Sequence, residues 1–238
     1  MEENDQNKIS VRKIDDGKEN NSIENTEKVL TEKPLKERAA CVFLVMIIMS
    51  AIGWLVENTG KIYFSHCIDD RFHILPFIFP YGLAYLAMHV VLGDTDDIGF
   101  FGKKLFKNKT LKTKIFSNIL YVAIICFFVF IGELAVGNMY EAVTGTALWD
   151  YSGRFLHVTR YVCLMSTLGF GVGAYLLMKF VLTPLYKLLL NKGNQKAILI
   201  VDCTLGALVV ADCLSMILIT FITKSPPHWW TIPVNWFK

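Results

Sequence analysis

The sequence predicts an all-α integral membrane protein, on the strength of its composition, its hydropathy and the length of its apolar runs. Apolar and aromatic residues make up 53% of the 238 residues, above the roughly 45–50% typical of soluble domains. The mean hydropathy is +0.42. Five apolar runs approach or reach the ~20 residues that a helix needs to cross a bilayer. These expected spans are 39–56, 74–92, 115–136, 158–180 and 197–222.

The chain divides into a charged tail and a membrane domain. Residues 1–38 are rich in Glu, Asn and Lys and poor in large apolar side chains, so we expect them to be disordered. This segment is too long and too acidic for the start of a cleavable signal peptide, so the first apolar run should remain in the protein. The membrane domain is therefore expected to cover 39–238.

The second run is the least regular of the five. Pro76 and Pro80 lie near its start, where proline removes backbone donors and restricts the preceding residue. Irregular backbone at membrane depth is tolerated where it faces protein or a wet cavity. The second span is therefore predicted to begin with irregular backbone.

The distribution of lysine and arginine predicts the orientation. Loops on the predicted inner side carry four, six and four cations near the spans, and loops on the outer side carry two each. The inner cations are Lys28, Lys33, Lys36 and Arg38; Lys103, Lys104, Lys107, Lys109, Lys112 and Lys114; and Lys179, Lys187, Lys192 and Lys196. By the positive-inside rule the N-terminus is cytoplasmic and the C-terminus external.

With this orientation, opposite charges from four segments meet near the outer boundary of the membrane. The candidate site residues are Glu57, Arg71, Glu133, Glu141, Asp150 and Arg160. Glu133, Gly137 and Glu141 recur every four residues and would share one helix face. A carboxylate at membrane depth needs a partner, so Glu133 is expected to pair with Arg160 or Arg71. Two interpretations stay open: structural ion pairs, or a pocket for a cation, a proton or a charged headgroup.

The last span contains Asp202 and Asp212, which in a helix would lie about 15 Å apart and about 80° apart around the axis. They would therefore not form one bidentate site. A hydrogen bond to Ser50, Ser166 or Thr167 of another helix is the favoured explanation, and a proton-transfer step is the alternative.

Several catalytic motifs are absent or out of context. The sequence has no P-loop, HExxH or G-x-S-x-G pattern, so an enzyme is not the favoured class and any ATP chemistry would need a separate ATPase. Gly169, Gly171 and Ala174 imitate a dinucleotide fingerprint, but they lie inside an apolar run; Gly169 and Gly173 instead predict close helix packing. The six cysteines form no C-x-x-C pair, and we expect no metal and no cofactor. The lysine-rich stretch 100–116 favours anionic lipid over nucleic acid.

Three stretches resemble a known family: "GWLVENTGKIYF", "LPFIFPYG" and "GELAVGNMYEAVTGTALWDYSGRFLHVTRYVCL". The chain is similar there to the ABC-transporter type IV, or CmpB-like, family of bacterial membrane proteins, from about Gly53 to Pro184. The resemblance implies a permease-like subunit of the plasma membrane. It marks Gly53, Glu57, Arg71, Pro76, Tyr81, Gly82, Glu133, Glu141, Trp149, Asp150, Tyr151, Ser152 and Arg160. The chain departs from the pattern at Phe72, where the family usually has glycine, at His157, and near Gly169.

The leading functional hypothesis is a transport-type membrane subunit, embedded in the lipid bilayer, with an outer-face polar site. Glu133 would be its binding or protonatable carboxylate, and Pro76, Tyr81, Trp149 and Tyr151 would support it. Two other classes stay open. One is a membrane enzyme that acts on a lipid or envelope precursor with carboxylates as acid and base. The other is a sensor or scaffold that binds a membrane partner through Gly169 and Gly173.

Overall fold

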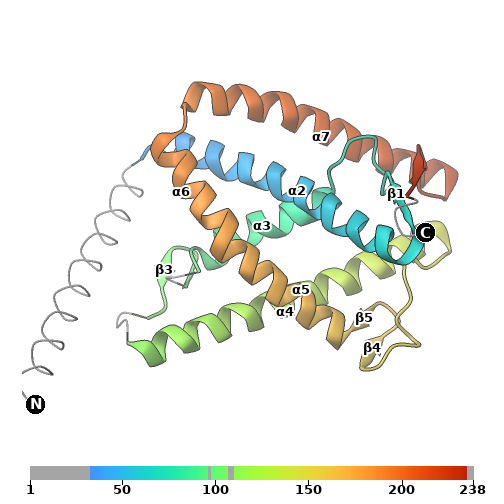
Figure 1. Ribbon diagram of the computed structural model, residues 1–238, viewed down its shortest axis with the longest axis horizontal. Coiled ribbons are helices and arrows are strands. Elements are labelled where there is room, and N and C mark those ends of the chain that lie inside the picture. The colour runs from blue at the N-terminus through green and yellow to red at the C-terminus, as the bar shows by residue number, and fades with distance from the viewer. Residues whose placement is uncertain (1–32, 96–97, 107–109, 235–238) are drawn as a thin grey trace, which may run out of the picture.

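The computed structural model describes residues 33–95, 98–106 and 110–234, and its helices lie side by side with alternating direction (Figure 1). Three long helices run one way: α2 (Leu35–Ser65), α4 (Leu111–Thr144) and α7 (Gln195–Thr223). The opposite direction is taken by α3 (Phe79–Leu92) and by a continuous rod of α5 (Leu164–Leu177), the π-helical turn η1 (Met178–Leu182) and α6 (Thr183–Lys192). Pro184 has no N–H for the carbonyl one turn earlier, which accounts for the wider turn before it.

The predicted membrane fold is confirmed. Within the described ranges, four helical segments are long and apolar enough to cross a membrane, namely Leu35–Ser65, Leu111–Thr144, Leu164–Lys192 and Gln195–Thr223. Large apolar side chains on their outer surfaces are exposed, such as Phe127 at 62% and Leu218 at 59%. Such surfaces suit contact with lipid, and the chain is a multi-pass membrane protein.

The second predicted span differs from the expectation in length. Helix α3 has 14 residues, which makes it about 21 Å long and shorter than the hydrocarbon core. Residues Ile74–Ile78 before it have no regular secondary structure. The irregular backbone predicted around Pro76 is therefore confirmed, and the regular helix of this span begins only at Phe79, because proline prevents a helix from extending backwards past Ile78.

Two other predicted boundaries, the end of the tail and the start of the fourth span, differ from those in the structure. Helix α2 begins at Leu35, so the last residues of the predicted tail are helical; residues 1–32 of that tail lie outside the described ranges. The fourth span was expected from Val158, but residues 157–163 form a hairpin of β4 (His157–Thr159) and β5 (Val162–Cys163). Hydrogen bonds to two backbone carbonyls explain this hairpin: Tyr151 N donates to Arg160 O at 2.8 Å, and the Trp149 indole donates to Tyr161 O at 2.8 Å. These bonds hold residues 160–161 away from a helix.

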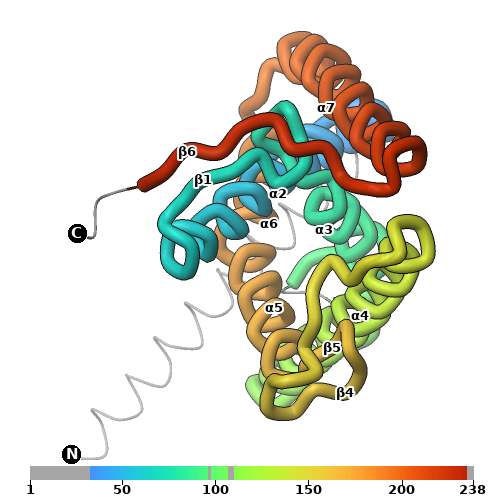
Figure 2. Tube along the Cα trace, turned by 90° about the vertical axis from the view of Figure 1, so that its right-hand side faces the viewer, coloured from blue at the N-terminus to red at the C-terminus, as the bar shows by residue number. Residues whose placement is uncertain are grey.

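The described residues contain two further pairs of short strands. At one end of the molecule β1 (Cys67–Asp69) pairs antiparallel with β6 (Thr231–Pro233), as Figure 2 shows. At the opposite end β2 (Gly99–Phe100) pairs with β3 (Lys103–Lys104). Phe101, in the turn of that hairpin, is 73% exposed. An exposed aromatic beside lysines fits the predicted contact with anionic lipid; Lys107 and Lys109 of the same stretch lie outside the described residues.

Small residues let the helices approach closely. A Cβ on Gly82 of α3 would overlap Ser50 of α2, and a Cβ on Gly171 of α5 would overlap Cys126 of α4. Around these contacts a core of buried side chains forms, including Val45, Tyr85 and Tyr121. The sequence had pointed to Gly169 and Gly173 instead. A Cβ on either of them would meet no described atom within 4 Å, so the close helix contact is made by Gly171, on another face of α5.

Candidate functional site

The polar end of the molecule is the end at which α2, α4 and α7 terminate and at which β1, β4, β5 and β6 lie (Figures 1 and 2). All six predicted site residues lie on elements of this end. The structure does not bring them into one cluster of ion pairs. It divides five of them between two clusters, one on α2 and one on α4, and leaves Glu133 outside both.

The α2 cluster consists of Gly53, Glu57, Arg71 and Tyr81. Arg71 Nη2 lies 2.6 Å from Glu57 Oε2, and the Tyr81 hydroxyl donates to Glu57 Oε1 at 2.7 Å. The Tyr81 ring packs on Gly53, one turn before Glu57, where a Cβ would overlap the ring. A second carboxylate, Asp69, lies 4.0 Å from Arg71 Nη1. The cluster thereby fixes the start of α3 and the preceding loop against the end of α2.

The α4 cluster consists of Gly137, Glu141, Asp150, Arg160 and Tyr161. Arg160 donates from Nη1 to Glu141 Oε1 at 2.7 Å and from Nε to Asp150 Oδ2 at 2.9 Å. The Tyr161 hydroxyl donates to Glu141 Oε2, and its ring packs on Gly137, one turn before Glu141, where a Cβ would overlap it. The cluster holds the β4–β5 hairpin and the Asp150 loop against the end of α4.

The two clusters therefore repeat one arrangement. In each, a helix that ends at the polar end carries glycine and, four residues later, glutamate. A tyrosine ring covers the glycine, its hydroxyl reaches the glutamate, and an arginine neutralises that glutamate. Positions four residues apart lie on one helix face, which lets a single tyrosine contact both. Tyr161 was missed from the sequence; the repeated G-x-x-x-E pattern, Gly53–Glu57 and Gly137–Glu141, was the signal that could have found it.

Glu133 lies two helical turns before Glu141, and its surroundings differ from the prediction. It is half-buried, and it accepts hydrogen bonds from Ser166 Oγ at 3.5 Å and Thr167 Oγ1 at 3.2 Å. The expected pair with Arg160 or Arg71 was wrong, because each arginine already binds the glutamate of its own cluster. Among the described residues, Glu133 has hydroxyl partners and no cationic one.

Tyr151 is joined to Glu133 through Ser166. Its hydroxyl lies 3.2 Å from Ser166 Oγ, the group that also donates to Glu133. Burial raises the pKa of Tyr151, and the negative charges of Glu133 and Glu57 raise it further, while the bond with Ser166 lowers it. Both carboxylates therefore lie close enough to act on this phenol. The predicted supporting residues Tyr81, Trp149 and Tyr151 thus all bond within this region.

The two aspartates of α7 are in unlike environments. Asp212 accepts from the backbone N–H of Ile74 at 2.9 Å and of Leu75 at 3.3 Å, and it lies 3.3 Å from His73 Nδ1. It thereby holds the irregular segment that contains Pro76. Asp202 is buried without a described partner. The predicted contacts with Ser50, Ser166 or Thr167 were wrong, because Ser50 donates to its own helix and the other two donate to Glu133.

Asp70 is a structural residue of this end that the sequence did not reveal. Its carboxylate accepts from the backbone N–H of Phe72, Trp229 and Trp230, and it lies near His228. Burial raises the pKa of Asp70, but these backbone bonds outweigh it and leave the pKa below its ordinary value. Among the described residues, no group of three His, Cys, Asp or Glu side chains is placed to hold a metal ion.

A family model described as "Putative ABC-transporter type IV" matches residues 44–217. That range is most of the chain and contains Gly53, both arginines, Glu133 and both aspartates of α7. The chain belongs to this family. No curated protein and no solved structure matches the chain.

The backbone at Phe72, where the chain departs from the family resemblance, has an unusual conformation. Phe72 has a φ of 71°, in the left-handed region that glycine adopts most readily. The glycine that the resemblance implies after this arginine would fit such a backbone. Here phenylalanine forms the left-handed turn, and its N–H donates to Asp70 at 2.9 Å.

Proposed function

We propose that this chain is a transport-type subunit of a bacterial plasma membrane, with the polar end outside and the N-terminus in the cytoplasm. Membership of the ABC-transporter type IV family supports the class. The alternating direction of α2, α3, α4, the α5–α6 rod and α7 supports five passages, with the irregular segment before α3 completing the second. Lysines such as Lys112, Lys187 and Lys196 lie at the opposite end, which suits the cytoplasmic side.

Glu133 is the centre of the proposed outer-face site. The carboxylates of the two clusters each have an arginine at 2.6–2.9 Å. Glu133 instead receives two hydroxyl groups, at the end of the apolar part of α4. A carboxylate at this depth is costly when ionised without a counter-charge. It is therefore suited to take up a small monovalent cation or a proton, and this single observation carries the proposal.

Hydroxyl oxygens around the carboxylate fit that ligand class. Ser166 and Thr167 contact Glu133 with hydroxyl oxygens that can turn from donors into ligands when a cation binds, and the Tyr151 hydroxyl lies next to Ser166. Because the chain has no nucleotide-binding motif, energy from ATP would come from a separate ATPase at the lysine-rich end.

Cation binding can be tested without knowing the transported substrate. The full-length protein, purified in detergent, would be melted in NaCl, KCl or choline chloride at one ionic strength and at several pH values. A ligand that binds the folded state raises the melting temperature as its concentration exceeds its dissociation constant. We expect stabilisation by Na⁺, K⁺ or protonation in the wild type, and its loss in Glu133→Gln.

A matched control separates this effect from a general change of charge. Glu37→Gln makes the same substitution in the first turn of α2, at the opposite end of the molecule, and it should respond to salt and pH as the wild type does. Thr167→Val should weaken the response without removing it, because one hydroxyl is lost. If Glu133→Gln shows the same cation and pH response as the wild type, the proposed site is wrong.

A further inference from the structure

Asp202 is a buried carboxyl group in α7 that the outer-face site does not use. It is 5% exposed, and neither carboxyl oxygen has a hydrogen-bond partner among the described residues. It lies about two turns from the start of α7, in the half of the helix far from the polar end. A group of this kind needs a physical account, because buried polar atoms are nearly always hydrogen-bonded.

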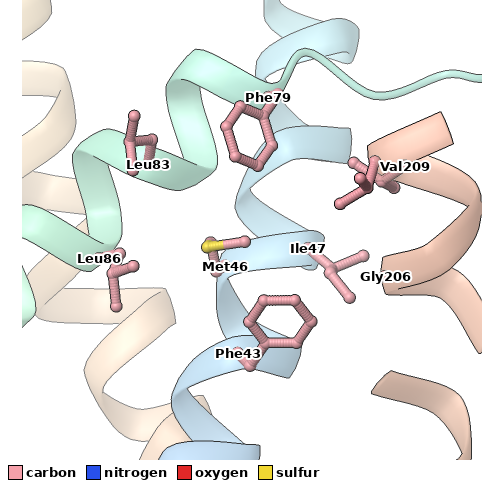
Figure 3. A pocket seen from close by; sticks show the side chains of 9 residues that line it. Phe43, Met46, Ile47, Phe79, Leu83, Leu86, Gly206 and Val209 are labelled. Carbon is pink, nitrogen blue, oxygen red and sulfur yellow. The ribbon is translucent and has the colours of Figure 1, made fainter. Parts of the chain in front are cut away.

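The surroundings of Asp202 are apolar. On α7 it shares the buried face with Ile198 one turn before it and Gly206 one turn after it. Phe43 of α2 lies over Gly206, where a Cβ would meet its ring at 2.8 Å. Beyond Gly206 this face borders a cavity of about 200 Å³ between α2, α3 and α7 that is lined by apolar groups (Figure 3). Among the described residues, none donates a hydrogen bond to this carboxyl group.

No opposite charge compensates Asp202 within the described residues. The helices packed most closely against α7 are α2 and α4, and no charged side chain of either acts on this carboxyl. The titratable group that faces it from α2 is the Cys41 thiol, which donates towards Gln195 Oε1 at 3.8 Å. Tyr186 of α6 lies near the same thiol and interacts with the cation Arg38 of α2, but neither Arg38 nor another cation is among the groups that act on Asp202. Neither a thiol nor a phenol supplies a positive charge.

Asp212, ten residues further along the same helix, shows the contrast. It is 6% exposed, and so as buried as Asp202. Two backbone N–H groups donate to its two oxygens, an arrangement that stabilises the ionised form. Asp202 has none of these donors. Burial without donors or counter-charge favours the neutral acid.

We propose that Asp202 is held as a neutral carboxylic acid and is a proton-binding site in the half of α7 opposite the polar end. The ligand is a proton, bound on a carboxyl oxygen and released as the carboxylate forms when that part of α7 meets water. The site is separate from Glu133 and does not depend on it. A protonatable group inside a span gives the chain a route to proton coupling of its own, independent of any ATPase.

Infrared spectroscopy of the purified full-length protein tests this directly, because a protonated carboxyl has a C=O stretching band that a carboxylate lacks. Across a pH series from mildly acidic to mildly basic, we expect such a band in the wild type on the acidic side, its loss in Asp202→Asn and its retention in Asp212→Asn. Asparagine has nearly the shape of the neutral acid, so this variant should keep the fold. Glu133→Gln should retain the Asp202 band, which keeps the result independent of the outer-face site.

Labelling of the wild-type protein gives a second measurement that needs no variant. An apolar carbodiimide in membrane vesicles modifies protonated carboxyl groups in apolar surroundings, and mass spectrometry locates the adduct. We expect the adduct on Asp202 and not on Asp212. An infrared spectrum that Asp202→Asn leaves unchanged, or labelling that spares Asp202, would overturn the proposal.

Discussion

The α2 and α4 clusters join the same side chains in different surroundings. In the α2 cluster the Arg71 and Glu57 side chains are 22% and 29% exposed. In the α4 cluster the Arg160 and Glu141 side chains are 46% and 37% exposed. The α2 cluster clamps one helix to another, since Tyr81 belongs to α3, whereas Tyr161 of the α4 cluster belongs to a hairpin.

The difference assigns the two clusters different mechanical roles. Ion pairs in water contribute little to stability, and partly buried ones are harder to replace. The α2 cluster should therefore hold its part of the polar end rigidly, whereas the hairpin held by the α4 cluster should move more easily. Glu133 lies on α4 and accepts hydrogen bonds from Ser166 and Thr167 of α5. These two residues follow directly after the β4–β5 hairpin. Access to the proposed site should accordingly open on the α4 side.

The largest difference in unfolding free energy between the two clusters is expected when the glutamate of each, Glu57 or Glu141, is neutralised. Glu57→Gln leaves the partly buried Arg71 without its close carboxylate and should cost about 2 kcal/mol of unfolding free energy. Glu141→Gln should cost clearly less, because Arg160 keeps Asp150 at 2.9 Å and is open to water. Unfolding of both variants in mixed detergent micelles measures the difference. An equal or larger loss in Glu141→Gln would contradict the proposed roles.

Filling the two glycines should give a smaller contrast. Gly53→Ala places a methyl group against the Tyr81 ring, which α3 holds in position, and should cost about 1–2 kcal/mol. Gly137→Ala meets the Tyr161 ring in the same way, but the hairpin can shift to accommodate it, so the loss should be smaller. Gly132→Ala on α4 is the control, because a Cβ there meets nothing within 4 Å. A loss in the control like that in Gly53→Ala would show that the rings are not the cause.

The smallest effect concerns acid conditions at the α4 cluster. The Ser152 backbone N–H and hydroxyl, followed by Arg160, lower the pKa of Asp150 to about 2. A lowered pKa stabilises the fold above the unfolded value of about 3.9, and the contribution is lost as pH falls towards the folded value. The melting temperatures of wild type and Asp150→Asn should therefore differ above about pH 4 and converge towards pH 2. A difference that does not vary with pH would rule out this linkage.

Hydropathy predicted the long helices well because a spanning segment must be apolar along its whole length. It failed at α3 and at the start of α5. In both places short-range hydrogen bonds decide the backbone: Asp212 holds Ile74 and Leu75, and Trp149 holds Tyr161. A hydropathy profile carries no record of such bonds.

The sequence predicted where the candidate site lies, but it did not predict which carboxylate each arginine binds. Charge counting placed Glu57, Arg71, Glu141 and Arg160 at one end, where the structure has them. Which carboxylate each arginine binds depends on loop geometry, and so Glu133 was assigned a counter-ion that belongs to Glu141. The repeated spacing of glycine and glutamate was visible in the sequence, but its meaning required the tyrosine that covers each glycine.

The pairing of β1 with β6 constrains the order in which the chain is assembled. Residues 67–69 follow the first long helix, yet their partners, residues 231–233, follow the last. The carboxylate of Asp70 likewise binds the N–H groups of Trp229 and Trp230. During synthesis, the bonds between this loop and residues 229–233 can form only after α7 has been made. The segment that follows α7 therefore stabilises the loop between α2 and α3. A protein fused to this segment should disturb that loop and, with it, the position of Arg71.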